Sequence, residues 1–98
     1  MPYIIICRDK PNSHQLRADT RPTHLAYLDQ HEAKLLAGGA LLSDDATSAD
    51  GSVLIYDTED RAEAEAFSAG DPFTKAGLFQ SVEIRRWRKG YLAGKKQG

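Results

Sequence analysis

Two residues far apart in the chain, His24 and Asp71, have side chains suited to acid–base chemistry. An imidazole takes up and releases a proton near neutral pH, because its ordinary pKa is about 6.5. His24 falls at the border of the apolar stripe of an expected helix, so it should face the edge of a sheet. It can act there as a general base or acid, or pack as a histidine hydrogen-bonded to a carbonyl. The residues alone leave both interpretations open.

Asp71 lies in the stretch "SAGDPFTKAGLFQ", residues 68 to 80, between Gly70 and Pro72. Aspartate is a favoured helix N-cap, and proline suits the first position of a helix. The sequence therefore predicts that Asp71 caps a short helix over "PFTKAG". This role does not exclude chemistry, because one carboxylate oxygen can cap the helix while the other reaches a histidine.

Three further polar residues are candidates for substrate binding: Arg17, Arg21 and Ser43. The two arginines precede the first expected helix, and Arg8 leaves the first strand. Guanidinium groups at that end of a sheet can receive an anionic or phenolic substrate, or they can simply be solvated. Ser43 ends the second expected strand and can donate a hydrogen bond to a ligand. No G-x-S-x-G surrounds it, so a serine hydrolase has little support.

The remaining histidines and the one cysteine do not indicate a metal site. His31 follows His24 by seven residues, whereas two metal ligands on one straight helix are typically four residues apart. His14 stands in a polar loop, where solvation is expected. Cys7 ends an apolar strand and should be buried as a small hydrophobic residue. A lone cysteine forms no internal disulfide, so the fold needs no oxidising compartment.

The first helix is expected to start at Pro22 and to run to Ala37, because no glycine or proline interrupts it before Gly38-Gly39. Its core-facing stripe consists of Leu25, Leu28, Leu35 and Leu36. The segment from 8 to 21 is polar and contains a proline, so a loop is expected. The other expected elements are strands at Tyr3–Cys7, Ala40–Ser43, Ser52–Thr58 and Phe79–Trp87, and a helix at 59–70 with Ala62, Ala66 and Phe67 inward.

The resulting order, β-α-β-β-α-β, is that of the ferredoxin-like α+β fold. Two right-handed βαβ crossovers would give an antiparallel sheet with both helices on one face. The other face would then expose apolar area, which is typical of a partner surface. A back-to-back homodimer would bury that face.

Composition narrows the function classes further. The 98 residues fit one domain, and the net charge of −1 argues against a nucleic-acid binder. The basic run "RRWRKGYLAGKK" is expected to be a solvated strand with a flexible tail from about residue 90, with phosphate binding as the alternative. No signal peptide or apolar run of membrane-spanning length is visible, so a cytoplasmic protein without a membrane partner is expected.

Three stretches together resemble the YCII-related (YciI-like) domain: "RPTHLAYL" at 21–28, "LLAGGALL" at 35–42 and "AGDPFTKAGLFQSVEIRRW" at 69–87. The resemblance covers nearly the whole chain. It implies a dimeric α+β barrel of ferredoxin-like protomers, which agrees with the element order above. It also implies that His24 and Asp71 are the histidine and aspartate with which the family's enzymatic activity is associated. Some relatives are linked to the removal of HCl from chlorinated hydroxyhydroquinones.

The resemblance makes a cofactor-free mechanism available. Asp71 would orient the imidazole of His24, which would take a proton from a phenol or from a carbon next to a carbonyl. Elimination or isomerisation would follow, and neither needs a metal. The expected cleft is apolar and suits a small aromatic ligand, with Tyr3, Tyr27, Phe73 and Phe79 as its lining. Two alternatives remain: a dimer that binds or senses a small molecule without turnover, and a domain used for association.

Overall fold

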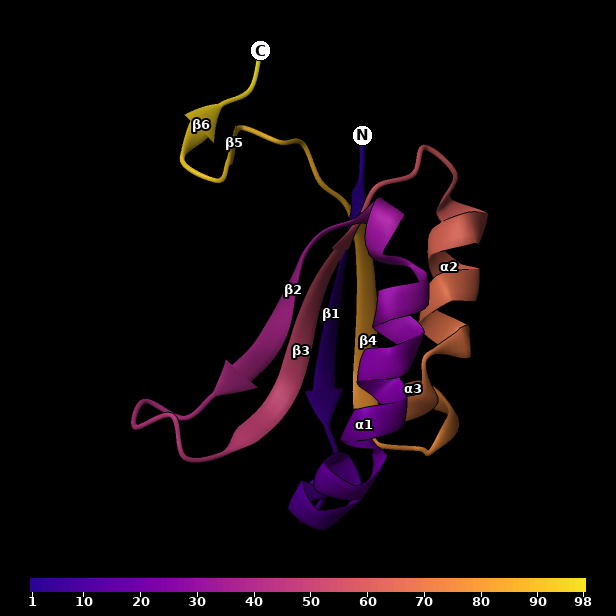
Figure 1. Cartoon of the computed structure of the whole chain (residues 1–98), viewed down its shortest axis with the longest axis vertical. Coiled ribbons are helices and arrows are strands. Elements are labelled where there is room, and N and C mark those ends of the chain that lie inside the picture. The colour runs from indigo at the N-terminus through magenta and orange to yellow at the C-terminus, as the bar shows by residue number, and fades with distance from the viewer.

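The computed structural model describes residues 1–98, and its main feature is an antiparallel sheet with helices on one face (Figure 1). The elements are β1 (Tyr3–Asp9), α1 (His14–Gln30), a 3-10 turn (Glu32–Lys34), β2 (Leu35–Leu42), β3 (Ala49–Tyr56), α2 (Arg61–Gly70), α3 (Pro72–Lys75), β4 (Phe79–Arg86), β5 (Tyr91–Leu92) and β6 (Lys95–Lys96).

The four long strands lie in the order β2-β3-β1-β4, and every neighbouring pair is antiparallel. This is the predicted ferredoxin-like βαββαβ arrangement, and the α+β prediction is confirmed. The apolar run in β1 makes it a central strand. Tyr3, Ile5 and Cys7 of that strand are buried, whereas Ile4 and Ile6 between them are only half-buried. This alternation follows from the two-residue period of a strand.

The prediction for the first helix was wrong at both ends. The helix starts at His14, so Pro22 lies inside it and not in its first turn. The chain reverses earlier, at Asn12, whose φ of 59° is left-handed, and the polar residues that follow are compatible with a helix. At the other end, the helix stops at Gln30 and Gly38-Gly39 belong to β2. Gly38 pairs with Leu54, and a Cβ at Gly38 would come within 2.7 Å of the Leu54 side chain.

The core lies between the sheet and the helices, and its buried residues are Tyr3, Ile5, Cys7, Leu54, Tyr56, Ala64 and Phe67. On α2, the predicted inner face was partly wrong. Phe67 is buried, but Ala62 and Ala66 are exposed, and Ala64 and Ser68 are buried in their place. Residues 64, 67 and 68 share one face of a helix that begins at Arg61, and the carboxylate of Asp60 caps that start.

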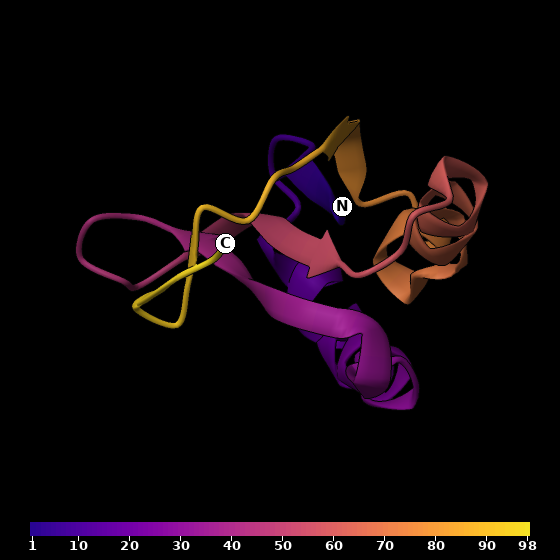
Figure 2. The same ribbon diagram turned by 90° about the horizontal axis from the view of Figure 1, so that it is seen from above.

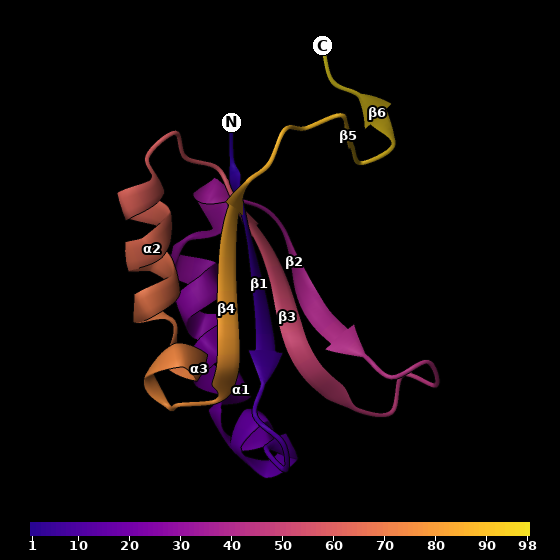
Figure 3. The same ribbon diagram turned by 180° about the vertical axis from the view of Figure 1, so that it is seen from behind.

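No helix covers the opposite face of the sheet (Figure 3). The strand register places on it the half-buried residues Ile4, Ile6, Leu41, Val53 and Ile55. This apolar face is the one expected from the sequence, and the homodimer that would cover it stays a prediction.

After β4 the chain leaves the sheet and forms the small β5–β6 hairpin, which projects on the side of β2 and β3 and away from α2 (Figures 1 and 2). The flexibility expected from about residue 90 stays a prediction. None of the helices combines the length and the apolar character needed to span a membrane.

Candidate active site

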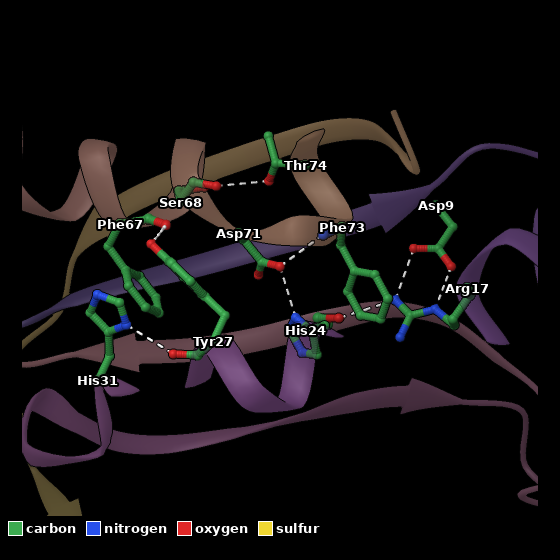
Figure 4. Close-up of polar contacts among 11 residues, drawn as sticks. Asp9, Arg17, His24, Tyr27, His31, Phe67, Ser68, Asp71, Phe73 and Thr74 are labelled. Carbon is green, nitrogen blue, oxygen red and sulfur yellow. Dashed lines mark hydrogen bonds and ion pairs between the residues drawn. The ribbon is translucent and has the colours of Figure 1, made fainter. Parts of the chain in front are cut away.

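The fold brings His24 and Asp71, which are 47 residues apart in the sequence, into hydrogen-bond contact. Nδ1 of His24 lies 2.8 Å from Oδ1 of Asp71 (Figure 4). His24 projects from the middle of α1, and Asp71 occupies the junction between α2 and α3. Both residues are buried, with exposed fractions of 6% and 2%. The contact therefore lies in the protein interior, where electrostatic interactions are screened little by water.

Asp71 is the N-cap of α3, as the sequence predicted. Its Oδ1 accepts the backbone N–H of Phe73 at 2.9 Å, and Pro72 occupies the first position of the helix. One detail differs from the expectation that separate oxygens would serve the two partners: the same Oδ1 contacts Phe73 N and His24 Nδ1. These two contacts fix the carboxylate on a short and rigid connection.

The contact with Asp71 determines which nitrogen of His24 is free. An ionised carboxylate only accepts hydrogen bonds, so Nδ1 must carry a proton and donate it. In the neutral imidazole, Nε2 then bears the lone pair. Nε2 has no hydrogen-bond partner within the chain, and His24 lines a cleft. The side chain can therefore accept a proton from a molecule in that cleft.

Phe73 supports the imidazole from the side. The two rings stack with centroids 4.0 Å apart and an angle of 16° between their planes. Phe73 is itself almost fully buried and meets Phe79 edge to face at 6.0 Å. The guanidinium carbon of Arg17 lies 4.7 Å from the Phe73 ring centroid. One aromatic ring thus contacts both His24 and Arg17, two of the α1 side chains that line the cleft.

Arg17 lies on α1, because the helix begins earlier than predicted, and it forms a buried ion pair with Asp9. Nε donates to one oxygen of Asp9 at 2.6 Å, and Nη2 donates to the other at 2.9 Å. Nη2 also donates to Oγ of Ser52 at 3.0 Å. Sequence reasoning missed Asp9 and Ser52. Asp9 continues the inward-facing series of Tyr3, Ile5 and Cys7 along β1, and Ser52 is the partner of Cys7 on β3, so the two-residue period of the strands was the signal that could have found both.

The cleft beside these residues has a volume of about 230 Å³ and lies between α1, the strands β2 and β3, and α3. A site of this size suits a small ligand. Its lining comprises Arg17, Arg21, His24, Leu25, Leu28, Gly38, Gly39, Ala40, Ser52, Leu54 and Phe73. A second cavity of about 380 Å³ adjoins it, shares Arg17 and Arg21, and extends under the β2–β3 loop.

Of the predicted binding residues, Arg17, Arg21 and Phe73 line the cleft with His24, whereas Ser43 and Tyr27 do not. Ser43 lies in the β2–β3 loop, where its hydroxyl donates to Asp45 at 2.7 Å. Tyr27 donates to the carbonyl of Phe67 at 2.9 Å and so packs α1 against α2.

Tyr3 and Phe79, which were expected to line the cleft, pack in or against the core. Cys7 is also buried in the core, and its burial, together with the negative charges of Asp71 and Asp9, raises the pKa of its thiol to about 12.

The other two histidines take no part in this site. Nδ1 of His31 lies 2.9 Å from the carbonyl oxygen of Tyr27, and its ring packs beside Phe67. His14 is exposed at the start of α1. Nowhere do three or more histidine, cysteine, aspartate or glutamate side chains gather as metal ligands would.

Solved structures provide the first comparison with known proteins. The chain is similar to the 5-chloro-2-hydroxyhydroquinone dehydrochlorinase TftG from Burkholderia phenoliruptrix AC1100, solved in complex with 2,5-dihydroxybenzoquinone. The two are 40% identical with a TM-score of 0.83, over 90% of this chain and 94% of that chain. An antibiotic biosynthesis monooxygenase, with 16% identity and a TM-score of 0.53 over 90% of this chain and 99% of its own, shares the fold alone.

Comparison of amino-acid sequences also finds similar proteins over most of the chain. Protein YciI of Escherichia coli O6:H1 is 32% identical, over 91% of this chain and 98% of that protein. An uncharacterized protein of Haemophilus influenzae is also 32% identical, over the same shares. Residues 1–88 match the family described as the YCII-related domain. The chain therefore belongs to the YCII-related domain family, as its motifs indicated.

Proposed function

We propose that the protein is a lyase-like enzyme that uses His24 as a general base and Asp71 to orient it, on a small cyclic or aromatic compound. The main support is the free Nε2 of a buried imidazole that faces the cleft and whose other nitrogen contacts a buried carboxylate. This is the arrangement in which a carboxylate holds the correct tautomer and stabilises the imidazolium that forms. The proposed proton transfers and the loss of chloride require no metal and no cofactor.

The reaction class is elimination of the kind named for TftG, the 40% identical dehydrochlorinase. On a chlorinated hydroxyhydroquinone, Nε2 would take the proton of the hydroxyl next to the C–Cl carbon. The electron pair would form a ketone, and the C–Cl carbon would receive the proton from the imidazolium. Loss of a second proton, from the hydroxyl para to the new ketone, would then expel chloride with its bonding pair. The sum is one HCl lost and one hydroxyquinone formed.

The decisive test replaces each partner of the pair. We expect His24→Ala to abolish chloride release from 5-chloro-2-hydroxyhydroquinone, and Asp71→Asn to reduce it to a small residual rate, both measured anaerobically together with the quinone absorbance. Far-UV circular dichroism should be unchanged. Turnover at the parent rate by both variants would refute the proposal. A parent protein that binds 2,5-dihydroxybenzoquinone but eliminates no chloride would favour the alternative, a dimer that binds or senses a small molecule.

A further inference from the structure

The C-terminal β5–β6 hairpin lies beyond the part of the chain that matches the YCII-related domain. The match stops at residue 88, before β5 begins. The turn residues Ala93 and Gly94 both have positive φ angles, 51° and 78°, as in a tight two-residue hairpin turn. The amide of Gln97 donates to the carbonyl of Gly90 at 2.9 Å and closes the base of the hairpin. The hairpin is therefore a defined structure that this chain adds to the family domain.

The hairpin carries positive charge that nothing in the chain neutralises. Arg88 and Lys89 lead into it, and Lys95 and Lys96 form its second strand. None of these four side chains takes part in an ion pair of the chain. Tyr91 in the first strand is 66% exposed. A two-stranded hairpin has little stability of its own in water, so this one gains stability from a partner that covers it.

Charge of the opposite sign gathers where β2 turns into β3. This acidic tip, residues 43–51, reads "SDDATSADG" and contains Asp44, Asp45 and Asp50 but no arginine or lysine. All three aspartates are exposed, and none takes part in an ion pair of the chain. Asp45 accepts hydrogen bonds from two hydroxyls of the tip itself, at 2.7 Å each. The carboxylates of Asp44 and Asp50 are therefore the ones that can pair with a cation from outside.

The hairpin and the acidic tip do not meet within one molecule. They lie toward opposite ends of its long axis (Figure 1), and both lie on the side of the sheet away from α2 (Figure 2). The open apolar face, with Ile4, Ile6 and Ile55, is on that side. A second copy that covers this face with its strands running the opposite way would bring the hairpin of each chain to the acidic tip of the other. Twofold symmetry makes both contacts at once.

We propose that the β5–β6 hairpin is an arm that binds the acidic tip of a second copy of this chain. The apolar sheet face supplies the burial, and the charges fix which way round the two sheets pack. Thr47, Ser48 and Ala49 of the acidic tip line the cavity that adjoins the cleft of His24. The arm of one protomer thus holds the wall of that cavity in its partner. The inference does not depend on the reaction assigned to His24.

The test reverses the charge on each side of the contact separately, at exposed positions. Lys95→Glu with Lys96→Glu makes the arm acidic, and Asp44→Lys with Asp50→Lys makes the tip basic. For each double variant alone, the dimer dissociation constant from sedimentation at low salt should rise about tenfold or more, because both symmetric contacts become repulsive. An equimolar mixture of the two variants should form the heterodimer at about the parent affinity, since both of its contacts are attractive again. Native mass spectrometry identifies that heterodimer, and high salt should weaken its preference.

Arg61→Glu with Lys75→Glu is the matched control, because it makes the same change of charge at exposed positions on α2 and α3. Its dimer should be as tight as that of the parent. A mixture without preference for the heterodimer, or double variants that dimerise as the parent does, would overturn the inference. So would a monomeric parent, including one whose arm binds RNA or anionic vesicles instead. A parent that passes this test but releases no chloride would overturn the proposed function and leave the arm standing.

Discussion

Replacing Asp71 by asparagine separates the two roles of this residue. Asparagine is as good an N-cap as aspartate, so it keeps the contact with the N–H of Phe73. Its amide oxygen also accepts the proton on Nδ1 of His24 when the amide is turned that way. What is lost is the negative charge beside the imidazole. The variant should therefore fold normally, with a free energy of unfolding within about 1 kcal/mol of the parent.

The size of the catalytic loss follows from the contact distance. With Nδ1 and Oδ1 2.8 Å apart, the charge centres of an imidazolium and a carboxylate are about 4 Å apart. At an effective dielectric constant of about 20 they attract by about 4 kcal/mol. Most of this attraction is absent before proton transfer, when the imidazole is neutral. A loss of about 3–4 kcal/mol from the transition state corresponds to a fall in kcat of about 100- to 1000-fold.

Asp60 offers a control with the same local chemistry. It caps α2 as Asp71 caps α3, since its carboxylate accepts the N–H of Ala62 at 2.9 Å. Asp60 is exposed and does not contact His24. Asp60→Asn should turn over 5-chloro-2-hydroxyhydroquinone at the parent rate, with chloride release as the assay. If Asp71→Asn stays within about threefold of the parent while His24→Ala is inactive, the carboxylate charge is not needed and the reasoning is refuted.

Three other predictions follow from close contacts, from the buried thiol and from the open sheet face. In Gly70→Ala the new Cβ would lie 2.6 Å from the Tyr27 hydroxyl, so we expect a loss of about 1–3 kcal/mol in urea unfolding that adding Tyr27→Phe partly restores. The pKa of the Cys7 thiol is about 12 in the folded protein and 9.0 otherwise, so we expect no reaction with a thiol reagent at pH 8 before the protein unfolds. Above pH 9 only the unfolded state loses this proton, so the free energy of unfolding should fall by up to about 1.4 kcal/mol per pH unit. In Cys7→Ala the free energy of unfolding should fall less steeply with pH. Sedimentation at micromolar concentration should give twice the chain mass of 10.8 kDa, and a monomer would contradict a dimeric barrel.

The sequence predicted the order and kind of the main elements, because the apolar runs of the strands and the cap at Asp71 are local signals. It failed where the local signal was ambiguous. Pro22 is consistent with a helix start, yet the helix continues through it, because a proline costs one hydrogen bond that neighbouring turns can outweigh. The Gly38-Gly39 pair is typical of a helix C-cap, but its pairing with β3 makes it part of a strand.

The candidate site was predictable only in part, for a related reason. Residue types made His24 a candidate base and Asp71 a helix cap, and only the resemblance to the YCII-related domain paired them. Their contact depends on how α1 crosses the sheet relative to the α2–α3 junction, which no local pattern encodes. The early start of α1 also changed the position of Arg17, which the sequence had not predicted. It moved Arg17 from a loop into the helix, two turns before His24 and on the same face.

That shift explains why one helix can organise the whole site. A helix fixes the spacing of its side chains, so Arg17 and His24 need only one partner each from elsewhere, Asp9 from the end of β1 and Asp71 from the start of α3. Phe73 contacts both His24 and Arg17, so a change in its position would affect them together. The two pairs, His24 with Asp71 and Arg17 with Asp9, are thus parts of one unit in which His24 offers a free acceptor to the cleft. The proposed proton transfer therefore needs a ligand that presents an acidic proton to Nε2 of His24 in this cleft.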